Sequence, residues 1–142
     1  MSQLQILEQR RATAALNYIK AIKDLGDSQI STSYKSYCKS FPMWVKTNGL
    51  AAAVAFVKSK RKPENKKNAY NYLYDHLGQW LKECDLCLMQ DDSGDLASFV
   101  LKSNSYVYRS LTNEALAFFT WMRRLVDSEI EDKKEENKEA DE

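Results

Sequence analysis

The sequence predicts an all-α protein, a compact single-domain bundle of about five to six helices with a charged C-terminal tail. The 142 residues include only 4 Gly and 2 Pro, too few for the many tight turns of a β-sandwich or barrel. Ala, Leu, Lys and Glu are common, and all of them favour helices. A chain of this length can bury one core without disulfides or a metal.

A first helix is expected over residues 3–25, where apolar side chains follow a helical spacing: Leu4, Leu7, Ala14, Tyr18, Ile22 and Leu25. Gly26 supplies its C-terminal stop. A second helix over residues 31–40 is expected to end at Phe41, because the residue before a proline disfavours the α conformation. Pro42 is then expected to open a separate helical turn.

Asn48 and Gly49 are expected to form a turn, because both residue types tolerate positive φ. A buried helix follows over residues 50–60. Its alanines would let a neighbouring helix come close, and its larger apolar residues would supply most of the buried area: Val54, Phe56 and Val57. Cations gather at its end, which suits the negative end of the helix dipole, and residues 61–67 continue as a charged loop.

A longer helix is expected over residues 66–88, with an inner face of Tyr70, Leu73, Leu77, Trp80, Leu81, Cys84 and Leu88. Residues 91–95 form a linker that caps a short helix over residues 96–102. Ser103 is expected to cap the last helix, over residues 104–130. That helix carries an apolar stripe of Tyr108, Leu111, Ala115, Phe118, Met122 and Leu125.

The chain is expected to divide into a helical bundle domain, residues 1–130, and an acidic tail, residues 131–142. The tail has no apolar anchor and is expected to be disordered. The longest apolar run, residues 50–57, is far shorter than the roughly 20 residues that cross a bilayer. The N-terminus also lacks the apolar core of a signal peptide. These features predict a soluble, cytoplasmic protein with no membrane partner.

Cys84 and Cys87 form half of a zinc or redox motif, and a closed zinc site needs four ligands. Cys38 and His76 are the only further soft ligands in the sequence. Because the sulfurs fall inside a strong helical pattern, structural cysteines are favoured over a metal or redox site. The sequence therefore predicts no metal and no cofactor, with a small metal-dependent enzyme as the weaker alternative.

Other catalytic patterns are weak. Asp91, Asp92 and Asp95 do not match the spacing of a calcium-binding EF-hand loop, so a solvated capping loop is favoured. Asp75 and His76 are adjacent, and adjacent residues on a helix do not face each other. The sequence has no Gly-rich phosphate loop and no GxSxG nucleophile elbow. We therefore expect no enzymatic activity.

The charge is unevenly distributed along the chain. Residues 1–82 hold 14 Lys and Arg against 5 Asp and Glu, a surplus of 14 − 5 = +9, and residues 83–142 hold 7 against 15, which gives −8. Such a chain could bind a polyanion on a basic face or associate head to tail with its own copies. Alternatively, folding mixes the two halves and leaves no patch.

Lysines and arginines contact phosphates without reading base sequence, and they are the better candidates for function. The eight tyrosines could also act as platforms on which bases stack. Most of the tyrosines fall on expected inner faces, which favours packing. Tyr37 and Trp44 are the exceptions, because they flank the proline break.

Three segments, in order along the chain, carry a family resemblance. They are LEQRRATAAL at residues 7–16, FPMWVKTNGLAAAVAFVKSK at residues 41–60 and YRSLTNEALAFFTWMRRLV at residues 108–126. Together they resemble the small helical subunit of the Cmr complex, the type III-B CRISPR effector. The resemblance spans the chain from residue 7 to residue 126, with the middle and the acidic tail unmatched.

The resemblance implies a non-catalytic subunit of an antiviral RNA-guided particle. Copies of it would stack into a filament beside other Cmr subunits and hold the guide and target RNA through the RNA backbone. RNA contacts are expected from cations near the matched segments: Arg10, Arg11, Lys46, Lys58, Lys60, Arg61, Arg123 and Arg124. The alternative is a purely structural module that binds proteins and never touches nucleic acid.

Overall fold

Six α-helices and one short 3-10 turn make up residues 2–84 and 95–131, the part of the chain that the computed structural model describes. The elements are α1 (Gln3–Asp24), α2 (Ser28–Asn48), α3 (Leu50–Ser59), η1 (Glu64–Lys66), α4 (Ala69–Glu83), α5 (Leu96–Lys102) and α6 (Ser105–Glu129). These residues contain no strand, and the expected all-α class is confirmed. None of the helices in these two stretches is long and apolar enough to cross a bilayer.

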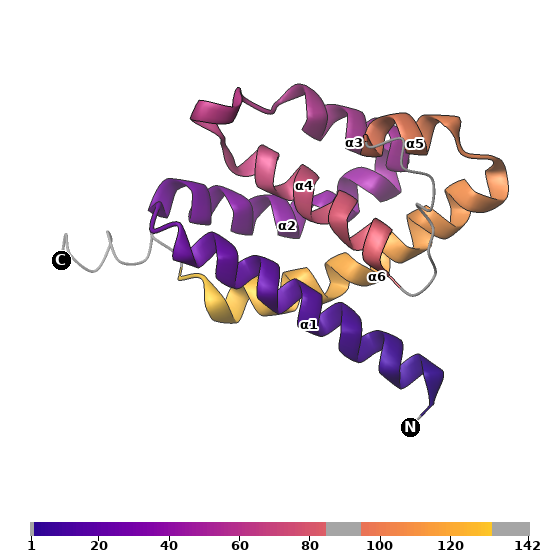
Figure 1. The fold of residues 1–142 in the computed structure, drawn as a ribbon, viewed down its shortest axis with the longest axis horizontal. Helices are drawn as coiled ribbons and strands as arrows, with labels where there is room; N and C mark the ends of the chain where they lie inside the picture. Colours follow the sequence, from indigo (N-terminus) through magenta and orange to yellow (C-terminus); the bar gives the residue numbers. More distant parts are fainter. Residues whose placement is uncertain (1, 85–94, 132–142) are drawn as a thin grey trace.

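The longest helix, α6, lies alongside both α1 and α2 (Figure 1). Helices α2 and α6 run in opposite directions. Near one end of the pair, the Lys35 ammonium donates to the carbonyl of Ile130 at 2.8 Å. At the other end, the Tyr108 hydroxyl accepts from the backbone N–H of Ala51 at 3.0 Å. The start of α2 therefore lies beside the end of α6.

The core centres on Phe118 of α6, which is fully buried. Its ring stacks on Trp80 of α4 at 5.2 Å between centroids and meets the edge of Tyr18 of α1 at 6.0 Å. The expected apolar stripe of α6 is confirmed at its centre, by the burial of Leu111, Ala115, Phe118 and Met122. Tyr108 and Leu125 are only half-buried.

The expected break at Pro42 is wrong, because α2 continues through this proline. Proline inside a helix removes one backbone hydrogen bond and costs about 3 kcal/mol. The buried residues of α2 keep a helical spacing across it: Tyr34, Cys38, Phe41 and Val45. Packing of this continuous apolar stripe on both sides of Pro42 offsets the local cost.

Gly49 alone separates α2 from α3, as the expected turn requires. Its backbone has φ of 90° and ψ of 158°, a combination open essentially to glycine only. The hydroxyl of Tyr108 accepts from Ala51, the second residue of α3. A residue on α6 thereby satisfies one of the free N–H groups at the start of α3.

Other expected boundaries also differ from the structure. Asp27 caps α2 and starts it at Ser28, three residues before the expected start. Asn68 forms a capping box that starts α4 at Ala69, and Cys84 turns extended with ψ of 155°, so the expected helix over 66–88 is wrong at its start and at Cys84. The residues beyond Cys84 in that helix lie outside the described residues. Asn104, not Ser103, caps α6 through a bond to Val107.

Candidate nucleic-acid interface

Three of the eight expected RNA contacts line one hollow between α2 and α6. The antiparallel packing of these helices places Lys46, near the end of α2, beside Arg123 and Arg124 of α6. The hollow has a volume of about 360 Å³, and its remaining lining residues are Pro42, Leu116, Thr120 and Asp127. All three cations are exposed. We call Lys46, Arg123 and Arg124 the basic hollow.

The one carboxylate in this lining, Asp127, is paired with cations of α2. Its Oδ1 lies 2.7 Å from Lys39 Nζ and 3.8 Å from Lys35 Nζ. The hydrogen bond from Lys39 is the main cause that lowers the pKa of Asp127. The carboxylate therefore stays charged at neutral pH, and Lys39 balances that charge. Arg123 also interacts with Asp127 electrostatically, and the Arg124 guanidinium lies 5.5 Å from the centroid of the Trp121 ring. All three cations of the basic hollow are nevertheless exposed to a ligand.

A second group of expected contacts lies at the end of α3, and most of its charge is engaged. The Lys58 ammonium donates to Asp95 at 2.6 Å. The Arg61 guanidinium lies 4.3 Å from the centroid of the Tyr74 ring. Lys60 is exposed and lies 5.6 Å from the centroid of Phe56. Of these three cations, Lys60 is the most open to a phosphate.

Asp95 is the partner that keeps the Lys58 ammonium in an ion pair. Its carboxylate accepts from Lys58, from the Tyr74 hydroxyl and from the backbone of Ser98. Partial burial acts to raise the pKa of Asp95, but the hydrogen bonds from Lys58 and Tyr74 outweigh burial and lower the pKa to about 2. The expected capping of α5 by this loop is confirmed at Asp95. Asp91 and Asp92 lie outside the described residues.

The two expected contacts on α1 have different environments. Arg10 is exposed and lines a separate hollow. Arg11 is buried, and both prongs of its guanidinium bind the Glu114 carboxylate at 2.8 Å. The Glu8 carboxylate accepts a further hydrogen bond from the Arg11 guanidinium. Arg11 therefore has no surface to offer RNA, and we leave it out of the interface.

Glu114 lies in the third segment that carries the family resemblance, and its role is structural. It is 1% exposed and also accepts from the Trp80 indole at 3.0 Å. Trp121 Nε1 donates to Glu8 at 2.8 Å and extends this network to the surface. The network joins α1, α4 and α6, so its role is to position helices.

The cysteines and the histidine do not assemble a metal site within the described residues. Cys38 and Cys84 are buried thiols that form no disulfide among the described residues, and Cys87 lies outside the described residues. The Tyr34 hydroxyl lies 2.7 Å from His76 Nδ1, and Tyr18 stacks on the imidazole at 4.6 Å. Burial lowers the pKa of His76 to about 4. No group of three or more His, Cys, Asp or Glu in residues 2–84 and 95–131 could hold a metal ion.

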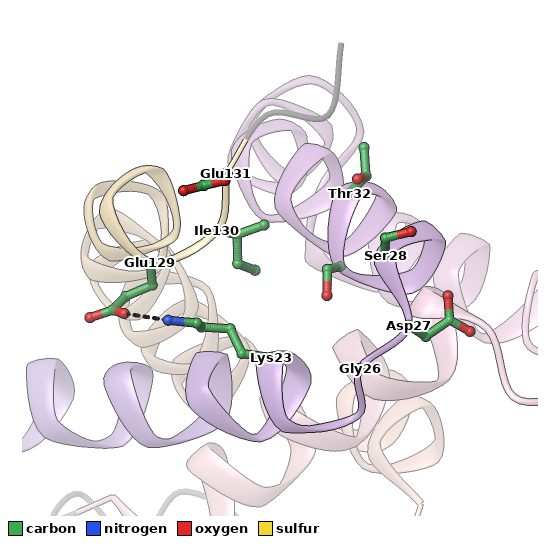
Figure 2. A pocket seen from close by; sticks show the side chains of 9 residues that line it. Lys23, Gly26, Asp27, Ser28, Thr32, Glu129, Ile130 and Glu131 are labelled. Atoms are coloured by element: carbon green, nitrogen blue, oxygen red, sulfur yellow. Dashed lines mark hydrogen bonds and ion pairs between the residues drawn. The ribbon is translucent and has the colours of Figure 1, made fainter. Parts of the chain in front are cut away.

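A further hollow, at the start of α2 and the end of α6, has acidic walls. Figure 2 shows it between the α1–α2 turn and the end of α6, with Lys23 turned toward Glu129. These two side chains form an ion pair of 3.2 Å. Asp27 and Glu131 are exposed and also line this hollow of about 570 Å³. We call Asp27, Glu129 and Glu131 the acidic hollow, which would repel phosphates.

Comparison with known proteins relates the chain to one family. A family model described as CRISPR-associated protein (Cas_Cmr5) matches residues 7–129. A crystal structure of a CRISPR-associated Cmr5 family protein from Thermus thermophilus superimposes with a TM-score of 0.63 at 25% sequence identity. The match covers 92% of this chain and 100% of the Thermus chain.

Proposed function

Because this chain belongs to the Cmr5 family of CRISPR-associated proteins, the small-subunit family of the type III-B Cmr effector, we propose that it holds RNA in that particle through the RNA backbone. The RNA is the guide, its target or the duplex of the two. The other Cmr subunits are its protein partners, and the assembly acts in the cytoplasm in antiviral defence.

The basic hollow carries this proposal. Lys46 and the Arg123–Arg124 pair come from segments more than 70 residues apart in sequence, and the antiparallel packing of α2 and α6 brings them to one concave surface. Lysines and arginines in such a groove bind phosphates without reading bases. Thr120 adds a hydroxyl to the same wall. Lys60 at the end of α3 is a further phosphate contact of the proposal.

The proposal includes self-association, which the two hollows support. The acidic hollow is lined by the start of α2 and the basic hollow by its second half. These two patches of opposite charge would allow head-to-tail stacking, with the acidic hollow of one copy against the basic hollow of the next. The acidic hollow is the proposed contact for cations of the next copy. Native mass spectrometry of the tagged chain, isolated from its host with its partners, should show several copies per particle. A single copy would contradict stacking.

The proposed role is that of a scaffold without catalytic activity. Buried cysteines and a histidine whose pKa burial lowers to about 4 are poor nucleophiles and bases near neutral pH. The residues proposed to meet RNA, those of the basic hollow, are cations, which suit binding more than bond cleavage. Chemistry in the particle would then belong to the other subunits.

The test is RNA binding by a charge-reversal variant, Lys46→Glu with Arg123→Glu. Fluorescence anisotropy with a labelled RNA gives the affinity over a range of salt concentrations. We expect the double variant to weaken binding to unrelated RNA sequences alike. With a single-stranded RNA, the slope of log affinity against log salt should fall by about 1.4, roughly 0.7 for each lost phosphate contact.

The matched control is Lys20→Glu with Lys102→Glu, which changes the net charge equally at exposed positions of α1 and α5. The control should keep most of the affinity, because neither lysine lines the basic hollow. An equal loss of RNA affinity in both double variants would show that the loss comes from the change in net charge. Full affinity in the Lys46/Arg123 variant would refute the basic hollow as the RNA site.

A further inference from the structure

A cluster of aromatic side chains on the surface is not used by the basic hollow. Phe56 of α3 meets Trp44 of α2 at 5.4 Å between centroids and Tyr70 of α4 at 6.0 Å, both edge to face. Tyr37 of α2 stacks on Tyr70 at 4.1 Å and meets Trp44 at 6.3 Å. We call Tyr37, Trp44, Phe56 and Tyr70 the aromatic cluster.

The aromatic cluster is open to solvent. Phe56 is 42% exposed, and the other three residues are half-buried. A phenylalanine exposed to this degree beside three partly exposed rings forms a contiguous apolar surface, and such surfaces mark interaction sites.

The indole of Trp44 provides a second observation. The indole N–H groups of Trp80 and Trp121 donate to carboxylates, whereas that of Trp44 has no acceptor among the described residues. No buried side-chain nitrogen or oxygen in the same residues lacks a hydrogen-bond partner. The Trp44 N–H therefore reaches solvent, where it can donate to a ligand.

The charge around the cluster selects an anionic ligand. Residues 28–63, which include α2 and α3, hold seven Lys and Arg and not one Asp or Glu. Lys60 lies 5.6 Å from the centroid of the Phe56 ring, and Arg61 follows it directly. Three of the seven cations pair with carboxylates of other elements, Lys35 and Lys39 with Asp127 and Lys58 with Asp95, but Lys60 is not among them. Aromatic rings beside such a cation are the arrangement that binds single-stranded nucleic acid.

We propose that the aromatic cluster is a stacking site for unpaired RNA bases, with Phe56 as its outer ring and Lys60 as the phosphate contact beside it. This inference rests on the proposed RNA-binding function and extends it from the backbone to the bases. Trp44 and Lys46 are two residues apart on α2, about 200° around the helix. The stacking site and the basic hollow therefore lie on opposite sides of α2 and can be altered separately.

The experiment compares two labelled probes of equal length, an oligouridine and an abasic oligonucleotide with the same number of phosphates. Each is titrated against the full-length chain and its Phe56→Ala variant. We expect Phe56→Ala to bind the oligouridine at least about fivefold more weakly, because one stacked base is worth that much or more. Affinity for the abasic probe should not change. Phe56→Tyr should restore oligouridine binding.

Met43→Ala is the matched control, because Met43 is an apolar residue of α2 that is 63% exposed and carries no ring on which a base could stack. It should bind both probes as the unaltered chain does. A circular dichroism melt of each variant checks that the fold is kept.

The outcomes separate the stacking site from the proposed function. Unchanged oligouridine binding by Phe56→Ala, or an equal loss for both probes, would overturn the stacking site and leave backbone binding intact. Loss of a Cmr subunit from the purified particle, with both RNA affinities kept, would identify the cluster as a protein interface and overturn the proposal. If the unaltered chain bound neither probe, the proposed function itself would fail.

Discussion

Arg11 and Glu114, 103 residues apart in sequence, form a two-pronged ion pair that is almost closed to water. The side chain of Glu114 is fully buried, and that of Arg11 is 10% exposed. This pair fastens the first helix to the last. Because buried charges are costly unless they are paired, the position of α1 against α6 is tightly specified.

Arg11→Met should therefore destabilise the protein strongly. The substitution leaves the buried Glu114 carboxylate with the Trp80 indole as its remaining hydrogen-bond donor. We expect a loss of about 3–5 kcal/mol in the free energy of unfolding, as for other broken buried pairs. Urea denaturation followed by circular dichroism measures it.

Lys23→Met is the control for that prediction. It breaks the Lys23–Glu129 pair, which also joins α1 to α6 but is exposed. Exposed pairs contribute about 1 kcal/mol or less, so the loss should be small. Similar losses for the two variants would show that the burial of Arg11 is not what makes its pair matter.

The helices could be predicted from the sequence because each has its own periodic stripe and local stop signals. The short helix α5 begins and ends at the expected residues, 96 and 102. The break expected at Pro42 follows from the local preference of proline. The stripe of apolar residues in α2, however, continues past this proline. In α2, tertiary packing overrides that preference. The identity of one residue does not reveal how strongly the helix around it is packed.

The basic hollow was only partly accessible to sequence reasoning. Lys46, Arg123 and Arg124 could be named as cations near motifs, but their meeting depends on the antiparallel register of α2 and α6. Arg11 looked equivalent to Arg10, because burial of a charge depends on a partner 103 residues away. Contacts between residues far apart in sequence therefore decide which cations stay exposed on the surface.

Gly49→Ala should destabilise the joint between α2 and α3. Its backbone conformation is strained for any residue with a Cβ, at a cost of about 1–3 kcal/mol. An added Cβ would also lie 3.2 Å from the Tyr108 hydroxyl, which caps α3. We expect thermal melts to show a lower midpoint, with the free energy of unfolding reduced by at least that strain.

Gly26→Ala separates strain from contact. Gly26 also has positive φ, 69°, but an added Cβ would have no neighbour within 4 Å. A left-handed alanine costs about 1–2 kcal/mol, so Gly26→Ala should be the milder change. If Gly26→Ala lowered the free energy of unfolding as much as Gly49→Ala, the contact with Tyr108 would not contribute to the loss.

The stability of the protein should fall as the pH drops below about 6.5, and His76 is the cause. Burial lowers the pKa of His76 from its ordinary value of 6.5 to about 4. Between these values the unfolded chain binds a proton that the folded chain does not. The stabilisation is therefore complete above pH 6.5 and is lost toward pH 4, at up to about 1.4 kcal/mol per pH unit.

His76→Gln tests this origin, because His76 is the only histidine in the chain. Glutamine can still accept from the Tyr34 hydroxyl but does not titrate. Urea denaturation from pH 7 to pH 5 should show a much flatter dependence for the variant. A slope as steep as that of the unaltered protein would assign the effect to the carboxylates instead.

Lys58 and Lys60 should differ in RNA binding although they lie two residues apart. Asp95 already neutralises Lys58 at 2.6 Å, whereas Lys60 has only a ring contact. We expect Lys60→Gln to weaken RNA binding and to lower the salt slope by about 0.7, the value for one contact to a single strand. Lys58→Gln should change neither by much.

Asp95→Asn should reverse the difference between the two lysines. Asparagine can still accept from the backbone of Ser98 and cap α5, but it no longer binds the Lys58 ammonium as a counter-charge. The released lysine would then add a phosphate contact, so affinity and salt slope should rise. Because Lys58→Gln on the Asp95→Asn background removes that released charge, it should now weaken binding. If it did not, Asp95 would not be what withholds Lys58 from RNA.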